Sequence, residues 1–191
     1  MTKIGVLALQ GAVAEHIRGI EKAGAEGVVV KRTEQLADLD GIILPGGEST
    51  TIGKLMRTYG FIDALKEFSA AGKPIFGTCA GLIVIAKEIT GQPAHLELMD
   101  ITVARNAFGR QRESFETDLP IKGIDENVRA VFIRAPLIEK VGPGVDVLAT
   151  YDGQIVAAQQ GHLLAASFHP ELTDDFRLHS YFLDMVKQRQ A

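Results

Sequence analysis

Residues 74–86 read Pro-Ile-Phe-Gly-Thr-Cys-Ala-Gly-Leu-Ile-Val-Ile-Ala, and they place a cysteine between two apolar segments. Pro74 to Phe76 predicts a strand, and the apolar residues from Leu82 to Ile89 predict a helix that Gly91 ends. Cys79 has a glycine two positions away on each side, as a turn without room for side chains requires. This pattern is typical of a nucleophile elbow. Amides at the start of the helix would favour a thiolate, so Cys79 is the predicted nucleophile.

The same alternation of strand and helix extends from this segment toward the N-terminus. Strands are expected at 4–9, 27–30 and 41–44, and helices at 13–23 and at 51–70, the latter broken near Gly60. Alternation of this kind indicates a parallel sheet covered by helices on both faces. The predicted fold is therefore α/β, flavodoxin-like and doubly wound, with a mostly parallel sheet.

The chain changes character after residue 95, where short strand candidates follow one another with little helix between them. Turns rich in Gly, Pro and Asp separate these candidates, which lie at 101–103, 130–133, 145–149, 154–158 and 163–168. We expect them to form antiparallel hairpin extensions of the sheet. A last helix is predicted from Asp174 to Lys187. Because the sequence contains no repeat or linker, residues 1–191 are expected to form a single domain.

Composition excludes several classes of function. The 191 residues carry a formal net charge of −4, without the basic run that nucleic-acid binding needs. No apolar stretch approaches the ~20 residues of a membrane span, and the first apolar run is too short for a signal peptide. We therefore expect a cytoplasmic protein with no nucleic-acid or membrane partner. With one cysteine, the chain has no intramolecular disulfide and no thiolate-rich metal site.

A thiolate that attacks a carbonyl needs hydrogen-bond donors for the developing oxyanion. In an elbow, the amide after the nucleophile supplies one donor, which is that of Ala80 here. Gly46 and Gly47 follow the third predicted strand, and their loop is expected at the same sheet edge as Cys79. We predict that this loop supplies the second donor, although an ordinary Gly-Gly turn would read the same way. The loop does not match a phosphate-binding P-loop, because the spacing from Gly47 to Gly53 is one residue too long.

The thiol also needs a base, and the sequence contains five histidines. His169 directly follows the apolar strand candidate at 163–168, so its side chain should reach the carboxyl edge of the sheet. Glu171 is placed to accept the other imidazole N–H and to fix the tautomer. We predict His169 as the base and Glu171 as its orienting partner. The remaining four are interpreted as solvated or structural: His16, His95, His162 and His179.

Taken together, the motifs resemble those of class I, triad-type glutamine amidotransferases, and more narrowly the glutaminase subunits of pyridoxal 5'-phosphate synthase. The resemblance covers essentially the whole chain. Its superfamily motifs are the elbow and the His-Pro-Glu part of Ser-Phe-His-Pro-Glu at 167–171. Its narrower motifs are Leu-Gln-Gly-Ala at 9–12 with Glu15 and His16, Arg105 with Phe-Gly-Arg-Gln at 108–111, and Phe-Ile-Arg-Ala-Pro at 132–136. The resemblance also includes Leu-Pro-Gly-Gly-Glu-Ser-Thr-Thr at 44–51.

This resemblance implies that Cys79, His169 and Glu171 form a catalytic triad. It further implies that glutamine is contacted by Gly47, Glu48, Ser49, Arg105, Ile133 and Arg134. An arginine can grip the substrate carboxylate in bidentate fashion, and Glu48 or backbone carbonyls could take the ammonium. From the residues alone, Arg105 and Arg134 would be ordinary surface arginines. No metal or organic cofactor is expected for the reaction.

The implied activity is hydrolysis of L-glutamine to L-glutamate and ammonia through a cysteine thioester. The resemblance also implies a partner, the barrel-shaped synthase subunit, to which ammonia is delivered. Gln10 follows the first predicted strand, and we expect it at the edge that meets this partner. Docking is predicted to organise the oxyanion loop, so that the isolated chain is weakly active. Two alternatives remain, another elbow-cysteine enzyme such as a hydrolase or glyoxalase-like protein, and a catalytically silent binding subunit.

Overall fold

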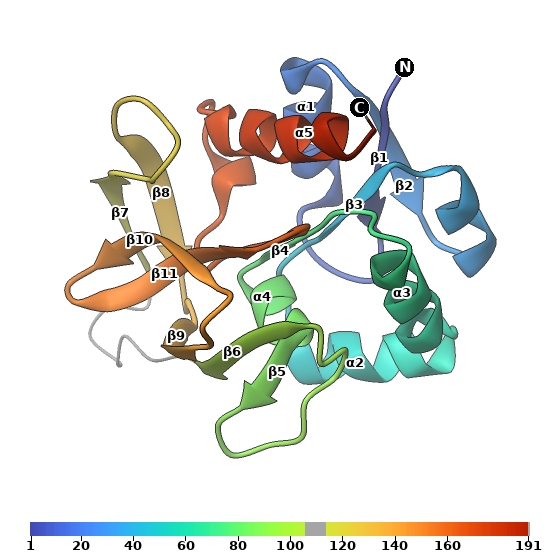
Figure 1. Ribbon diagram of the computed structural model, residues 1–191, viewed down its shortest axis with the longest axis horizontal. Helices are drawn as coiled ribbons and strands as arrows, with labels where there is room; N and C mark the ends of the chain where they lie inside the picture. Colours follow the sequence, from blue (N-terminus) through green and yellow to red (C-terminus); the bar gives the residue numbers. More distant parts are fainter. Residues whose placement is uncertain (106–113, 191) are drawn as a thin grey trace.

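The computed structural model describes residues 1–105 and 114–190, and its centre is a ten-stranded sheet (Figure 1). Five strands pair in parallel in the order β2-β1-β3-β4-β12. Their bounds are Lys3–Leu7 for β1, Glu26–Val30 for β2, Gly41–Leu44 for β3, Ile75–Thr78 for β4 and Leu163–Ala166 for β12. This is the flavodoxin-like order in which successive strands are added on both sides of the first, so the predicted fold class is confirmed.

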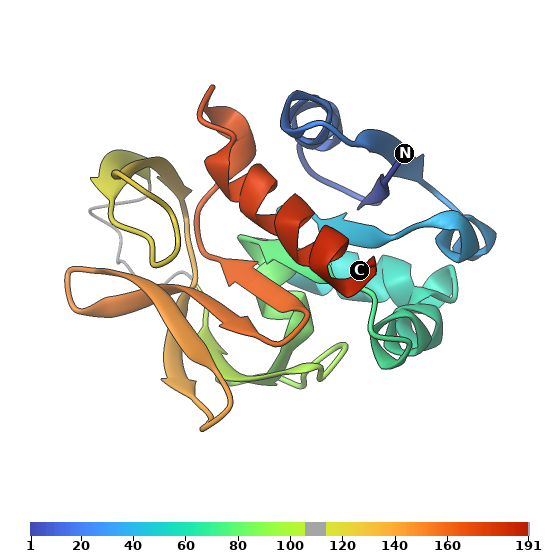
Figure 2. The ribbon, with the colours of Figure 1, turned by 45° about the horizontal axis from the view of Figure 1, so that its top comes forward.

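Beyond β12 the sheet continues through strands that run mostly antiparallel to their neighbours. β11 pairs with β12, β10 and β9, and β6 and β5 complete the order. Their bounds are Ala86–Ile89 for β5, Met99–Ala104 for β6, Leu137–Val141 for β9, Asp146–Tyr151 for β10 and Gln154–Gln160 for β11. Strands β7 (Ser114–Leu119) and β8 (Val128–Ile133) form a separate antiparallel pair, which Figure 2 shows at the end of the molecule remote from β2.

Helices cover both faces of the parallel strands (Figure 1). Helices α1 (Val13–Ala23) and α5 (Arg177–Gln190) lie side by side on one face. The other face carries α2 (Ser49–Thr58), α3 (Phe61–Ala70) and the short α4 (Ala80–Ile85). Two 3₁₀ turns complete the described elements, η1 (Thr33–Asp38) and η3 (Pro170–Leu172). Among the described residues, no helix combines the length and apolar character needed to cross a bilayer.

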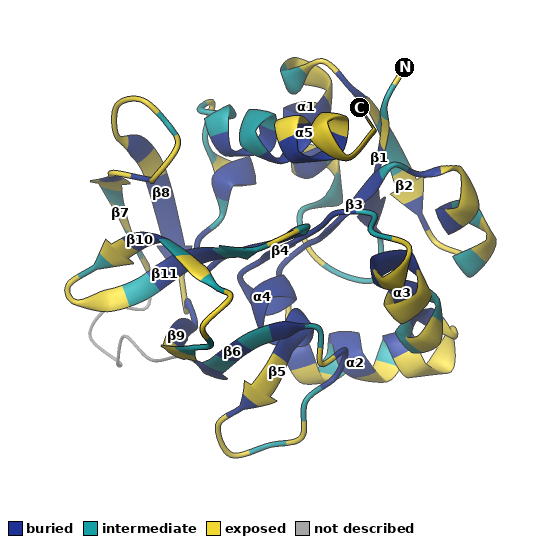
Figure 3. Cartoon of the chain, in the orientation of Figure 1, coloured by how far each residue is buried: buried dark blue, intermediate teal, exposed yellow. Residues whose placement is uncertain are grey.

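The two helical layers create two hydrophobic cores because alternate residues of a strand point to opposite faces. In β3, Ile42 and Leu44 belong to the core beneath α2, α3 and α4, whereas Ile43 belongs to the core beneath α1 and α5. Neighbouring β4 divides in the same way at Ile75 and Phe76. The central strands β3 and β4 are consequently buried along their length, as Figure 3 shows.

The predicted helix at 82–89 is wrong in its second half. Helix α4 ends at Ile85, and Ala86–Ile89 forms β5, which pairs with β6. A continuous apolar run is compatible with a buried helix or a strand, and pairing with β6 decides the outcome. Strands β7 and β9 were not predicted, since β7 is largely polar and β9 carries two charged residues. The last strand ends at Ala166 rather than 168, and the last helix begins at Arg177 rather than 174.

The close packing of α4 against β3 gives a testable prediction about stability. A Cβ added at Gly81 would lie 1.9 Å from the backbone oxygen of Leu44, so Gly81→Ala must displace main chain. We expect urea unfolding to show a loss of about 3 kcal/mol or more. Gly144→Ala is the matched control, because its added Cβ would meet its nearest neighbour, Gln160 Nε2, at 3.6 Å. The control should change stability by less than about 0.5 kcal/mol. Equal stability of the two variants would contradict this packing.

Candidate active site

Cys79 occupies the turn between β4 and α4 in a strained backbone conformation. Its φ is 53°, a left-handed value that residues with a side chain rarely adopt. The Cys79 amide donates a 2.8 Å hydrogen bond to the carbonyl of Ala166 on β12. A Cβ added at Gly77 would lie 2.4 Å from the backbone oxygen of Gly81, so the two flanking glycines permit the turn. The thiol faces the Ile133 carbonyl, with 3.8 Å between Sγ and oxygen.

His169 reaches Cys79 because their strands are adjacent and parallel. In the register of β12 and β4, Ala166 stands opposite Thr78, so residues that follow either strand emerge at one edge. The backbone amide of His169 is fixed by a 2.8 Å hydrogen bond to the Val131 carbonyl. Its side chain lies close enough to Cys79 for the cysteine to raise the pKa of the imidazole. The structure thus brings together two residues that are far apart along the chain.

Glu171 stands behind His169, in the 3₁₀ turn η3. Its Oε2 lies 2.8 Å from Nδ1 of His169, and its side chain is fully buried. Burial by itself lowers the pKa of His169, but hydrogen bonds and charges from Cys79 and Glu171 outweigh it and raise this pKa to about 10. The imidazole is therefore held as an imidazolium between two acidic groups at neutral pH.

The Gly46–Gly47 loop packs directly against the cysteine and the histidine. A Cβ added at Gly46 would lie 2.8 Å from His169 Cε1 and 3.3 Å from Cys79 Cβ. Gly47 has a φ of 137°, which favours glycine. Ala80 begins α4 immediately beside the thiol. The structure therefore brings the three residues predicted for the oxyanion hole next to Cys79, while their role as donors stays a prediction.

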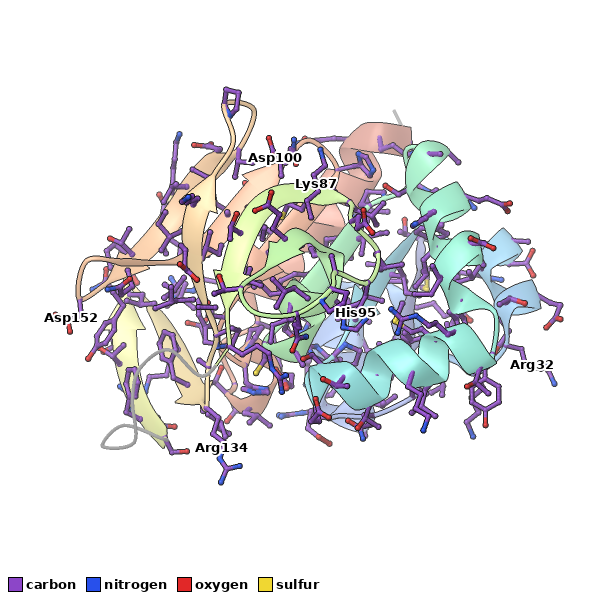
Figure 4. All side chains as sticks on the ribbon, turned by 90° about the horizontal axis from the view of Figure 1, so that it is seen from below. Arg32, Lys87, His95, Asp100, Arg134 and Asp152 are labelled. Carbon is purple, nitrogen blue, oxygen red and sulfur yellow. The ribbon has the colours of Figure 1, made fainter. Side chains whose placement is uncertain are left out.

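A pocket of about 260 Å³ opens in front of the cysteine. Besides Cys79 and Ala80, its lining contains five of the six residues predicted to contact glutamine: Gly47, Glu48, Ser49, Arg105 and Arg134. Ile83 and Pro136 also line it, and neither was predicted as a site residue. Ile133 contributes its carbonyl near the thiol instead, and its side chain is exposed. Arg134 extends outward from the surface in Figure 4.

Glu48 and Arg105 place opposite charges on the pocket wall. The Glu48 carboxylate caps α2 by accepting the backbone N–H groups of Thr50 at 2.6 Å and Thr51 at 3.3 Å. These hydrogen bonds, that of Thr50 foremost, lower the pKa of Glu48 and keep it ionised. Arg105 lies 3.3 Å from Glu48 Oε2 and donates to Gln92 at 2.7 Å. The pocket therefore offers one fixed anion and one oriented cation.

Gln10, predicted at a partner interface, lies against the glycine loop within this chain. Its Oε1 accepts a 2.8 Å hydrogen bond from the Glu48 backbone N–H. A Cβ added at Gly47 would lie 2.5 Å from the same oxygen. The structure thus connects the segment after β1 to the predicted oxyanion loop. The predicted motif at 108–111 lies outside the described residues.

Two histidines close to the site were not predicted to contribute. His16 and His179 are buried, so the solvated alternative is wrong for both. His16 Nε2 lies 3.6 Å from Glu171 Oε1. The spacing of Val13, His16, Ile17 and Ile20 puts His16 on the apolar face of its helix, which was a signal for burial. The other two histidines have polar partners away from the triad: His162 hydrogen-bonds Ser69, and His95 hydrogen-bonds Arg57.

Comparison with known proteins agrees with this geometry. The chain is 77% identical over 187 residues to "Pyridoxal 5'-phosphate synthase subunit PdxT" from Niallia circulans, covering 97% of this chain and 98% of that protein. It is 64% identical over 192 residues to the protein of the same name from Halalkalibacterium halodurans, covering 100% of this chain and 98% of the relative. A solved structure described as a glutamine amidotransferase superposes with a TM-score of 0.92 at 49% identity, covering 96% of this chain and 98% of that one.

The match to a family model extends over almost the whole chain, from residue 6 to residue 188, and includes Cys79, His169 and Glu171. On the strength of this match and of its relatives, the chain belongs to the SNO glutamine amidotransferase family.

Proposed function

We propose that this chain is a glutaminase subunit that hydrolyses L-glutamine to L-glutamate and ammonia through a thioester on Cys79. The observation that carries the proposal is the grouping of Cys79 with His169, whose imidazole is hydrogen-bonded to Glu171, where Cys79 lines a pocket that also bears Glu48 and Arg105. A nucleophile, a base and an orienting carboxylate are the groups that amide hydrolysis by a covalent route requires.

In the first half of the reaction, the Cys79 sulfur attacks the carboxamide carbon and forms a C–S bond. The carbonyl oxygen becomes an oxyanion, for which the Ala80 amide and the Gly46–Gly47 loop are the proposed donors. His169, an imidazolium at neutral pH, gives its proton to the amide nitrogen. The C–N bond then breaks, leaving ammonia and a glutamyl thioester.

In the second half, His169 is neutral and accepts a proton from water as the water oxygen attacks the thioester carbon. The C–S bond breaks, glutamate leaves, and the thiolate and imidazolium are restored. Glu171 keeps Nδ1 of the imidazole engaged at 2.8 Å, so that Nε2 is the nitrogen available for proton transfer throughout.

The charges on the pocket wall suit an amino acid zwitterion. Arg105 offers guanidinium hydrogens to the α-carboxylate, and Glu48 offers a carboxylate to the α-ammonium. Because Glu48 is tied to the start of α2, its charge has a fixed position. This complementarity favours glutamine over the simple amides that another elbow-cysteine hydrolase would accept. The intact triad residues likewise disfavour a catalytically silent binding subunit.

Ammonia released near neutral pH is mostly protonated and is then a poor nucleophile, so a glutaminase serves best when it delivers ammonia directly. Relatives named as subunits of pyridoxal 5'-phosphate synthase suggest the recipient, the barrel-shaped synthase subunit. Gln10 is the proposed contact, because its side chain holds the Glu48 amide at the end of the glycine loop. A partner that moved Gln10 would act on this loop.

The proposal is tested by measuring ammonia release from glutamine, with and without the synthase subunit. We expect weak activity from the isolated chain, a marked rise with the synthase, and no turnover from Cys79→Ala in either condition. Full activity of Cys79→Ala would overturn the mechanism. High activity of the isolated chain that the synthase does not change would contradict the coupling.

The pH dependence tests Glu171. In the intact site, the alkaline limb of kcat/KM should lie near pH 10, because activity requires the His169 imidazolium. Glu171→Gln removes the negative charge that raises this pKa and leaves only the weaker acceptor of an amide oxygen, so we expect the limb to move to lower pH and kcat to fall about 10²-fold to 10⁴-fold. Glu116→Gln, at an exposed carboxylate paired with Arg129, serves as the control. An unshifted limb would contradict the assignment of Glu171.

Substrate recognition is tested at Arg105. Arg105→Gln removes the charged partner of the substrate carboxylate, and we expect the KM for glutamine to rise about 10-fold to 100-fold with a smaller change in kcat. Arg129→Gln is a matched control, since Arg129 is similarly exposed and similarly paired with carboxylates, but on the β7–β8 pair. A KM that stays constant in Arg105→Gln would contradict this role.

A further inference from the structure

Beneath the triad lies a buried polar series that the mechanism above does not use. His16 on α1 and His179 on α5 are each no more than 2% exposed, and His16 Nδ1 lies 3.0 Å from His179 Nε2. The other nitrogen of His16, Nε2, is 3.3 Å from Thr78 Oγ1 and 3.6 Å from Glu171 Oε1. Thr78 directly precedes Cys79, so His16 lies between the residue before the nucleophile and the carboxylate that binds His169.

The surroundings of Glu171 show why a donor is needed at this place. Oε2 of Glu171 is used by His169, whereas Oε1 is buried and has no hydrogen-bond partner within 3.5 Å among the described residues. A buried carboxylate oxygen without a donor is costly. His16 Nε2 lies 3.6 Å from this oxygen, so an N–H on that nitrogen would offset the cost.

The hydrogen-bonding requirements select one tautomer for each histidine. Burial, together with His179 and His169, lowers the pKa of His16 well below its usual value, and burial lowers the pKa of His179 to about 4, so both rings are neutral at pH 7. Each ring then carries one N–H. If His16 carried it on Nδ1, the Nε2 lone pair would face the carboxylate. The favourable assignment has His16 donating from Nε2 and accepting at Nδ1 from His179 Nε2–H.

The fold holds this pair with little freedom. Helices α1 and α5 pack side by side in both Figure 1 and Figure 2. Gly19 provides the space, because a Cβ there would lie 2.9 Å from the His179 ring. The rings of Phe76 and Phe176 also lie against His179, at centroid distances of 6.4 and 5.6 Å. The His179 imidazole therefore cannot turn without disturbing these contacts.

From this geometry we infer that His16 is a positioning residue for the triad: its Nε2–H orients Glu171 through Oε1 and contacts Thr78 before the nucleophile, while His179 fixes the tautomer of His16. The inference rests on the proposed function, because it assigns His16 an effect on the Glu171–His169 pair. His16 is not among the residues that line the pocket described above, so we infer that its effect passes through Glu171 and Thr78.

The first test compares two variants of His16 assayed for ammonia release with the synthase subunit present. His16→Leu removes the donor, and we expect kcat to fall about 10-fold to 100-fold with the KM for glutamine nearly unchanged, since a small displacement of a catalytic group is costly. His16→Gln places an amide N–H near the former Nε2 and should restore most of kcat. His162→Leu, at a partly buried histidine that hydrogen-bonds Ser69, is the control and should remain active.

A double-mutant cycle separates positioning from general damage. If His16 acts through Glu171, then His16→Leu should cost little further activity in a Glu171→Ala background. Additive losses, or a His16→Leu variant as active as the unchanged protein, would overturn the inference. In the latter case Cys79→Ala would still abolish turnover if the proposed function holds, so the two failures are distinguishable.

A third test uses the unchanged protein and requires no activity assay. Two-bond ¹H–¹⁵N correlations of the imidazole rings at pH 7 should show His16 and His179 both neutral and both protonated on Nε2. Protonation of His16 on Nδ1, or a His16 imidazolium, would overturn the inference even if His16→Leu fails to fold.

Discussion

The site depends on the parallel pairing of β4 with β12. Their register sets Thr78 opposite Ala166, and the Cys79 amide continues the ladder by donating to the Ala166 carbonyl. One residue beyond β4 is the nucleophile, and three residues beyond β12 is the histidine. Because both strands are buried on both faces by helices, neither can slip without exposing its apolar side chains, and the distance between sulfur and imidazole is fixed by the core.

Around this pair of strands, charged side chains of alternating sign extend from the pocket surface into the protein interior. The pocket wall carries Glu48 and Arg105 near solvent, the imidazolium of His169 lies behind the thiol, and the carboxylate of Glu171 is buried behind the imidazolium. Each charge has an opposite charge beside it, which compensates for the cost of burial. The neutral histidines at the back supply dipoles instead of charge, so the series ends inside the protein without an uncompensated ion.

Much of the fold could be predicted because local signals agree with tertiary structure. The helix at 13–23 and the strand at 41–44 have the predicted bounds, and the break near Gly60 falls between α2 and α3. Prediction failed where local signals were ambiguous. Ala86–Ile89 continues an apolar run and becomes a strand because β6 offers a partner, and β7 pairs with β8 despite its polar sequence.

The sequence by itself determined which groups are available and their immediate setting. Gly77 and Gly81 specify the tight turn at Cys79, and the two-residue spacing from His169 to Glu171 lets one side chain reach the other, since turns are decided by neighbouring residues. Only the tertiary structure decided that Gly46 packs against Cys79 and His169, and that His16 and His179 meet beneath Glu171. These contacts join segments from different helices and strands, and their geometry depends on how the layers pack, which no local pattern encodes.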